Sequence, residues 1–364
     1  MSSPSHQKIP VPTATTATTN TAPTLNPTRL HRRRALGLLI IIPALIVVSA
    51  LSLALGANPL PLSAVWEGLM HRDNSEAAVI VWSMRIPRIV VGILVGAAFG
   101  VAGALIQALT RNPLADPGIL GVNAGAGFAV TLGVGFFGLS SVSGYIWFAF
   151  IGAAVATALV YLISAGGGLG ASSSAQPITL VLAGVALAAV LGGITTFLTL
   201  INPDTFQSVR NWNLGSIART DLHDSFSVAP FIAVGLIIAL LLSGALNSIA
   251  LGDDLAASLG TRVFYTRVLG IIALTLLAGG GTALTGGISF VGLMIPHIVR
   301  WIVGPDQRWI IAYSALSAPV LVLAADVIGR IIARPGEIEV GIVTAVIGAP
   351  VLIALVRGKK ASGI

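Results

Sequence analysis

The sequence contains no cysteine and little charge, because Asp, Glu, Lys and Arg together make up 9% of its 364 residues. The lack of cysteine excludes disulfide bonds, thiolate metal sites and cysteine nucleophiles. Soluble domains hold about 25% charged residues, so this chain lacks the polar surface that a soluble enzyme needs. Hydrophobic residues make up 55% of the chain and occur in runs long enough to cross a bilayer. We therefore expect an all-α, polytopic membrane protein.

Common catalytic and metal-binding motifs are also absent. The chain holds neither G-x-x-x-x-G-K-[ST] nor H-E-x-x-H, and its five histidines are scattered. Asp326 is the only acidic residue deep within an apolar run, and Glu339 lies near the start of the last run. Carriers driven by protons or sodium usually bury more ionisable groups. We expect no catalytic residue, no metal site and no cofactor, and a channel or carrier powered from outside this chain.

Ten apolar stretches, separated by charged or Pro/Gly/Ser-rich turns, predict ten transmembrane helices. They cover residues 36–55, 89–109, 118–137, 145–165, 178–201, 228–246, 264–285, 287–303, 309–332 and 338–356. The stretches 264–285 and 287–303 are the weakest, because both carry charge and the second is short.

The chain ends differ from the span-rich domain, which we expect over residues 35–358. Residues 1–34 are rich in Pro and Thr and end in the basic run Arg32-Arg33-Arg34, which predicts a disordered cytoplasmic tail. Residues 359–364 form a short basic C-terminal tail. The basic run and the apolar stretch 36–55 together imitate a signal peptide. That stretch is longer than the usual apolar region of about 7–15 residues, so an uncleaved first span is the preferred interpretation.

The distribution of positive charge predicts the orientation of the spans. With ten spans and a cytoplasmic N-terminus, the inner segments hold 13 of the 20 Lys and Arg residues. Cytoplasmic loops carry an excess of such residues, so both termini are predicted to lie in the cytoplasm. The net charge of +7 therefore reflects topology and does not indicate nucleic-acid binding.

Small residues predict close packing of the spans. Gly92, Gly96, Gly100 and Gly103 lie on nearly one face of the second span. Lipid chains are as apolar as leucine, so tight helix association in a bilayer depends on small residues that let backbones approach. We expect these four glycines to pack against other helices in a compact bundle.

Positive charge also lies at the outer side, where topology disfavours it. Arg85 and Arg88 flank a proline at the outer end of the second span, and Arg330 lies near the outer end of the ninth. Arg85 and Arg88 could anchor the span at the interface by snorkelling, or they could dock acidic groups of a soluble partner. Arg330 lies four residues after Asp326, so the two could pair along one helix. That pairing is compatible with docking.

The inner connection from Leu251 to Gly260 predicts a short amphipathic helix. Its three leucines, Leu251, Leu255 and Leu259, recur every four residues and form one apolar face. Asp253 or Asp254 suits the N-cap, and Gly260 suits the left-handed position after the helix. Such a helix could fit a groove in a partner or could lie on the membrane surface.

Several blocks in a fixed order resemble the FecCD-type permease family, the membrane subunits of binding-protein-dependent ABC importers for iron-siderophores, haem and vitamin B12. The resemblance runs from about Arg85 to Arg357. Its blocks are Arg85–Arg88, Gln107–Gly121, Trp212–Ser216, Leu251–Gly260, Gly287–Arg300, Ala325-Asp326 and Val340–Pro350.

The resemblance implies a ten-span permease with the vitamin B12 importer fold in the cytoplasmic membrane. It implies a second permease copy or a sister permease, and two copies of a separate cytoplasmic ATPase that dock on the helix 251–260. It also implies an extracytoplasmic binding protein whose glutamates meet Arg85, Arg88 and Arg330. Gln307 and the run from Pro335 to Glu339 depart from the usual pattern of the family, which leaves the cargo less defined.

We therefore expect a permease that imports iron(III)-siderophore complexes with energy from partner ATPases. Cobalamin and haem are alternative cargoes. An ion-coupled secondary transporter and a membrane scaffold without transport are the alternatives from other classes.

Overall fold

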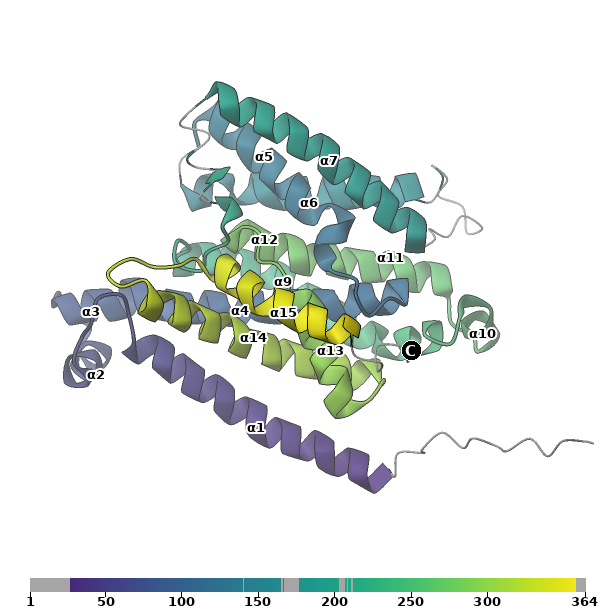
Figure 1. Cartoon of the computed structure of the whole chain (residues 1–364), viewed down its shortest axis with the longest axis horizontal. Helices are drawn as coiled ribbons and strands as arrows, with labels where there is room; N and C mark the ends of the chain where they lie inside the picture. Colours follow the sequence, from purple (N-terminus) through teal and green to yellow (C-terminus); the bar gives the residue numbers. More distant parts are fainter. Residues whose placement is uncertain are drawn as a thin grey trace, which may run out of the picture.

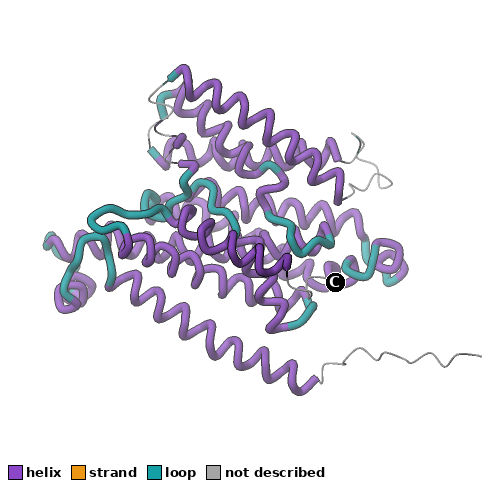
Figure 2. Tube along the Cα trace, viewed as in Figure 1, coloured by secondary structure: helices purple, strands orange, loops and turns teal. Residues whose placement is uncertain are grey.

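The structure is a computed structural model, and it describes residues 27–139, 141–164, 166, 177–202, 207, 209–210 and 212–357. These ranges contain helices and loops but no strand (Figure 2). The elements are α1 (Pro27–Ala54), α2 (Leu62–Met70), α3 (Glu76–Ile80), η1 (Val81–Arg85), α4 (Ile86–Thr110), η2 (Pro117–Leu120), α5 (Val122–Phe137), α6 (Val142–Ser164), α7 (Pro177–Ile201), α9 (Leu222–Ile249), α10 (Asp253–Ser258), α11 (Val263–Leu274), η3 (Thr275–Gly279), α12 (Gly280–Thr285), α13 (Val291–Val303), α14 (Gln307–Ile332) and α15 (Val340–Arg357).

The helices correspond to the ten predicted spans. Within the described residues, seven continuous helical segments are long and apolar enough to cross a membrane, and three shorter apolar helices lie at 122–137, 291–303 and 340–354. The long segments include α3, η1 and α4 as one span and α11, η3 and α12 as another. The all-helical, polytopic fold expected from the sequence is confirmed.

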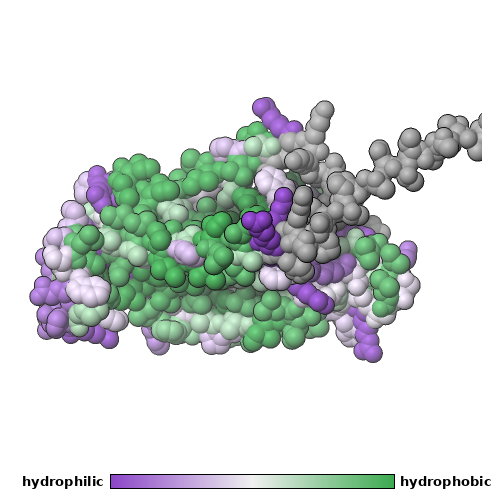
Figure 3. Space-filling model, turned by 90° about the horizontal axis from the view of Figure 1, so that it is seen from below, coloured by the Kyte–Doolittle hydropathy of each residue, from purple (hydrophilic) through white to green (hydrophobic). Residues whose placement is uncertain are grey.

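The two ends of the bundle carry different elements. The N-terminal end of α1, the short helix α10 and the C-terminal end of α15 lie at one end, whereas α2 and α3 lie at the other (Figure 1). By the charge distribution, the end with α10 is the inner end and the end with α2 is the outer end. Between them the surface is largely hydrophobic, and hydrophilic residues gather toward the ends (Figure 3). This banded surface suits a bilayer.

Helix α4 lies at the centre of the bundle and is packed by α14, α9, α13 and α12 (Figure 1). Every residue from Val95 to Thr110 is buried. Three glycines of α4 face α14. At Gly92, an added Cβ would lie 2.5 Å from the Leu323 side chain. At Gly96 it would lie 2.5 Å from the Pro319 backbone, and at Gly100 it would lie 2.6 Å from the Ser314 carbonyl oxygen. These positions allow α4 and α14 to touch along their length.

Gly103, the fourth glycine of the stripe, faces a different helix. A Cβ at this position would lie 1.8 Å from the carbonyl oxygen of Gly292, in the first turn of α13. One turn later in α4, Gln107 Nε2 donates hydrogen bonds to the carbonyl oxygens of Gly292 (3.3 Å) and Leu293 (3.0 Å). Backbone contact and side-chain hydrogen bonds therefore join α4 to the start of α13.

Helix α13 is short because the chain breaks between Thr285 and Val291. Gly286 has φ 75°, and Phe290 has φ 70°, which is uncommon for a residue with a side chain. At the break, the Ser216 amide donates to the Thr285 carbonyl oxygen (2.8 Å), and the Gly341 amide donates to the Gly215 carbonyl oxygen (3.0 Å). Three segments that are distant in sequence therefore satisfy one another's backbone groups, as buried backbone in a bilayer requires.

The first span begins earlier than expected, because α1 is helical from Pro27. Helix α1 therefore extends into the last residues of the predicted tail, and the domain boundary at residue 34 stays a prediction. Arg34 is buried, donates from Nε and Nη2 to the Val303 carbonyl oxygen (3.2 and 3.1 Å) and lies over the Trp309 ring at 4.8 Å. These contacts hold the extra helical turns against α13 and α14. The rest of the predicted tail, residues 1–26, and residues 359–364 lie outside the described part of the chain.

Candidate functional site

Arg85 closes the outer end of α1. Arg85 is the last residue of η1, a π-helical turn that joins α3 to α4 in one continuous helix. Ser75 caps the start of that helix. Arg85 is 2% exposed. Its Nη1 donates to the carbonyl oxygens of Leu53 (2.6 Å) and Ala54 (3.0 Å), and its Nη2 donates to that of Asn58 (3.0 Å). The last carbonyl groups of a helix have no partner within it and favour a positive charge, so Arg85 acts as the cap of α1.

Arg330 meets the same end of α1 from α14, and it is also 2% exposed. It donates to the carbonyl oxygens of Ser52 (3.1 Å) and Leu55 (2.7 Å) and to Ser52 Oγ (2.8 Å). Its Nη2 lies 2.6 Å from Asp326 Oδ2, which is the pairing along one helix that the spacing predicts. Buried charges need such partners, because an unpaired ion in an apolar region is very costly.

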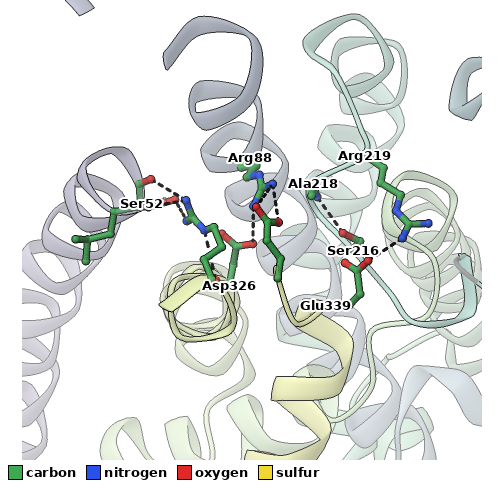
Figure 4. A network of polar contacts seen from close by, with 10 residues as sticks. Ser52, Arg88, Ser216, Ala218, Arg219, Asp326 and Glu339 are labelled. Carbon is green, nitrogen blue, oxygen red and sulfur yellow. Dashed lines mark hydrogen bonds and ion pairs between the residues drawn. The ribbon is translucent and has the colours of Figure 1, made fainter. Parts of the chain in front are cut away.

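Arg88 joins this pair to the outer loops. Its Nη1 lies 3.7 Å from Asp326 Oδ1, and its Nη2 lies 2.7 Å from Glu337 Oε2. The side chains of Arg88 and Asp326 extend toward one another from α4 and α14 (Figure 4). Nearby, Arg219 Nη2 pairs with Glu339 Oε1 at 2.7 Å (Figure 4). The acids of the loop before α15 thus neutralise two outer arginines.

The structure therefore brings the three predicted docking arginines together. Arg85, Arg88 and Arg330 line one outer cavity of about 340 Å³, together with Glu337 and Asn58. Arg85 and Arg330 are buried and held by internal contacts, and Arg88 keeps a small exposed surface of 12% of its side chain. Docking of a binding protein at these residues stays a prediction, and Arg88 is the member best placed for direct contact.

At the inner end, α10 is shorter than the predicted helix 251–260: Leu255 lies within it, Leu259 is its C-cap, and Leu251 precedes its N-cap Gly252. Leu251, Leu255 and Leu259 are 61%, 49% and 61% exposed, whereas Ala256 is fully buried against the bundle. Gly260 has φ 83°, as expected for the residue after the helix. A role in coupling to an ATPase stays a prediction.

The predicted cap of α10 is wrong, because the N-cap is Gly252, and Asp253 and Asp254 lie in the first turn. Asp253 instead pairs with Arg267 of α11 at 2.8 Å and lies 4.0 Å from Arg111 at the end of α4. Asp253 therefore connects α10 to α11 and to the end of α4. Gly252, with φ 108°, is the N-cap of α10.

The inner connection between α4 and α5 is a sequence of tight turns. Arg111 adopts a left-handed conformation with φ 51°, and the Asn112 amide donates to the Gln107 carbonyl oxygen (3.1 Å). Asp116 Oδ1 accepts from the Gly118 amide (2.8 Å) and caps η2. Burial raises the pKa of Asp116, and the hydrogen bond from Gly118 opposes that rise only in part.

Sequence reasoning missed several members of these clusters. The sequence analysis did not connect Glu337 or Glu339 with the outer arginines, although acidic residues on the outer side of a chain with unexplained outer arginines are a usable signal. Ser52 and the carbonyl groups of α1 gave no signal, because backbone acceptors are not visible in a sequence. Among the described residues, no group of three or more His, Asp or Glu side chains could hold a metal ion.

Comparisons with known proteins agree on one family. The family model of the FecCD transport family matches residues 44–358. The chain is 49% identical over 319 residues to the ferric enterobactin transport system permease protein FepD of Escherichia coli, a match covering 88% of this chain and 94% of the relative. It is 38% identical to the Fe(3+)-citrate import system permease protein YfmD of Bacillus subtilis, covering 90% and 96% of the two chains.

A solved structure shows the same fold. A metal-chelate type ABC transporter in an inward-facing conformation superposes with a TM-score of 0.76 at 27% identity, over 89% of this chain and 99% of the other. The two relatives are permease proteins of iron transport systems, and the solved structure is an ABC transporter. The chain therefore belongs to the FecCD transport family, as a multi-pass permease of the cytoplasmic membrane.

Proposed function

We propose that this chain is the permease subunit of a binding-protein-dependent ABC importer and that it translocates iron(III)-siderophore complexes. The observation that carries the proposal is the 49% identity to a ferric enterobactin permease across 94% of that relative. The second relative named above acts on ferric citrate, at 38% identity. Both cargoes are ferric chelates, which favours this class over cobalamin or haem.

The proposed assembly contains this permease, a second copy or a sister permease, two copies of a cytoplasmic ATPase and an extracytoplasmic binding protein. In it, this chain hydrolyses no ATP and supplies the transmembrane path by alternating access. The permease domain begins with α1 and ends near residue 358, and α10 lies within it as the coupling helix. Ferric siderophores are bulky, so a path between small and apolar side chains suits them better than a single ionic pocket.

Uptake of radiolabelled ferric enterobactin by iron-starved cells tests this proposal. Cells with the gene should accumulate the label, cells without it should not, and a protonophore should leave uptake intact while ATP stays high. Loss of uptake at high ATP would contradict an ABC importer and favour an ion-coupled carrier. Accumulation of cobalamin or haem, with no uptake of any ferric siderophore, would contradict the proposed cargo.

We propose that the outer arginine cluster, Arg85, Arg88 and Arg330, receives acidic side chains of the binding protein. Arg88 is paired with Glu337 at 2.7 Å on a partly exposed surface, so an incoming glutamate would compete with Glu337. Arg85 and Arg330 would support the docking surface from below, because they hold the outer end of α1 in place. Complementary charge of this kind increases the rate and specificity of association.

We propose that α10 docks into the ATPase through Leu251, Leu255 and Leu259. An exposed apolar face on a short helix suits insertion into a groove. Asp253 connects this helix to Arg267 in α11 at 2.8 Å, and Asp254 and Gly260 lie at its two ends. Movement of the ATPase would therefore reach the spans through a fixed contact.

Replacement of Leu255 and Leu259 by aspartate should reduce ATP-driven uptake at least tenfold, because charges would enter an apolar interface. The ATPase should no longer copurify with the permease. The control is Leu62→Asp at the outer end, where Leu62 is 70% exposed and no ATPase can reach. Unchanged uptake in the α10 variant, or equal loss in the control, would contradict the coupling role.

A further inference from the structure

A cavity at the inner end of the bundle is not explained by the proposed function. It measures about 600 Å³ and lies where the inner ends of α1, α4, α9, α13 and α14 meet. Arg34, Arg111 and Arg300 line it from three different helix ends, with Asp306 as the only acidic residue among its lining residues. Ala108 and Ala250 supply apolar walls. The lining therefore combines excess positive charge with apolar surface.

The three arginines differ in how far internal contacts satisfy them. Arg34 donates to the Val303 carbonyl oxygen and lies 3.9 Å from Asp306. Arg111 lies 4.0 Å from Asp253 in a partly exposed pair. Arg300 enters none of the ion pairs found among the described residues, and its Nε is buried without a hydrogen-bond partner there. Arg300 therefore brings an uncompensated positive charge to the cavity wall.

Two glutamines of the same cavity lack donors for their side-chain oxygens. Gln107 is 1% exposed and Gln307 is 5% exposed. In both, Oε1 is buried without a hydrogen-bond partner in the described part of the chain. Buried polar groups almost always have partners, and leaving one unpaired is destabilising. A fitting ligand would offer an anion to Arg300 and hydroxyl donors to the glutamines.

We propose that this cavity binds the headgroup of an anionic glycerophospholipid of the inner leaflet, with phosphatidylglycerol as the type that fits. Its phosphodiester matches Arg300 and Arg111, and its glycerol hydroxyls match Gln107 and Gln307. Basic pockets between transmembrane helices on the cytoplasmic side are suited to anionic headgroups.

The position and the charge of the cavity favour a lipid over other occupants. The cavity lies at the level where α4 ends and α14 begins, which is the membrane interface, and its apolar walls suit the glycerol backbone. The chain's own N-terminal residues carry Lys8, Arg29, Arg32 and Arg33 and no acid before residue 34, so like charge disfavours their entry.

Thermal unfolding of the detergent-solubilised full chain tests the inference. Short-chain phosphatidylglycerol should raise the unfolding midpoint in a saturable manner, and phosphatidylcholine of the same chain length should not. Glycerol 3-phosphate is the probe for a soluble phosphate ester. If it stabilises the protein as well as the lipid does, the ligand is not a lipid. If phosphatidylglycerol and phosphatidylcholine act alike, the headgroup site does not exist.

A matched pair of variants locates the effect. Arg300→Gln should weaken the apparent affinity for phosphatidylglycerol about tenfold, since one charge-assisted contact is lost. Arg308→Gln should leave it unchanged, because Arg308 is exposed at the same inner end and is not among the lining residues. Equal effects in both variants would indicate general attraction and overturn the site. If Arg300→Gln retains lipid affinity but loses the copurifying ATPase, the cavity receives an acidic side chain of that partner instead.

Discussion

Replacing Arg330 by glutamine is expected to destabilise the protein by about 3 kcal/mol or more, the usual cost of breaking a buried ion pair from one side. Asp326 would lose its partner at 2.6 Å while remaining buried. Ser52 and Leu55 would lose their hydrogen bonds to the guanidinium, so the outer end of α1 would lose one of the two arginines that hold it. Unfolding of the purified chain, followed by heat or by a denaturing detergent, measures the change.

The control carries the same substitution at an exposed pair. Arg219 and Glu339 also lie 2.7 Å apart at the outer end, but their side chains are 39% and 19% exposed. Surface pairs contribute about 0–1 kcal/mol, so Arg219→Gln should have a small effect. If the two variants lose equal stability, burial is not what makes Arg330 important.

The Arg88→Gln variant tests whether the arginine cluster binds the binding protein independently of its effect on stability. Arg88 touches Glu337 and the far oxygen of Asp326, and it makes no contact with α1 in the described hydrogen bonds. The variant should keep most of the stability that Arg330→Gln loses, and it should still weaken binding of the purified binding protein. Full affinity in a folded Arg88→Gln variant would remove Arg88 from the docking surface.

Gly103→Ala is expected to have a comparable or larger effect, of about 3 kcal/mol, although it adds one methyl group. That methyl would lie 1.8 Å from the Gly292 carbonyl oxygen, which belongs to backbone and cannot rotate away. Helices α4 and α13 would have to separate, and the two hydrogen bonds from Gln107 would lengthen with them. Overpacking a close-packed interior is destabilising for this reason. Yield and unfolding midpoint of the purified chain measure the effect.

Gly244→Ala is the matched control for this variant. Gly244 also lies within a membrane helix, α9, but a Cβ there would meet only the flexible end of Arg308 at 3.5 Å. Alanine has the better helix propensity by about 1 kcal/mol, so this variant should be neutral or slightly stabilised. Similar losses in both variants would show that the cost comes from something other than the approach of α4 to α13.

The sequence was informative where one physical rule dominates. The apolar runs located seven helical segments of membrane-spanning length and three shorter apolar helices, because a helix satisfies the backbone of an apolar run in lipid within the run itself. The i, i+4 spacing correctly paired Asp326 with Arg330, since helix geometry alone determines that distance.

The sequence was less informative where a residue's partner is backbone or is distant in the chain. Arg85 donates hydrogen bonds to carbonyl oxygens of α1, and no sequence pattern predicts which carbonyl groups accept. The early start of α1 depends on Val303 and Trp309, far along the chain from Arg34. The break before α13 depends on Gly215 and Gly341, which are meaningful only when three segments meet. Asp253 failed as a predicted cap because two arginines from other helices compete for it.

Helix α1 is connected to its neighbours at both ends. Arg85 and Arg330 hold its outer carbonyl groups, and Arg34 joins its inner half to Val303, while the Tyr313 hydroxyl donates to the Arg34 carbonyl oxygen. Sliding or tilting of α1 on its own would break these hydrogen bonds at both ends. The contacts at its two ends join α1 to α4, α13 and α14, so we expect any movement of the first span to involve these three helices as well.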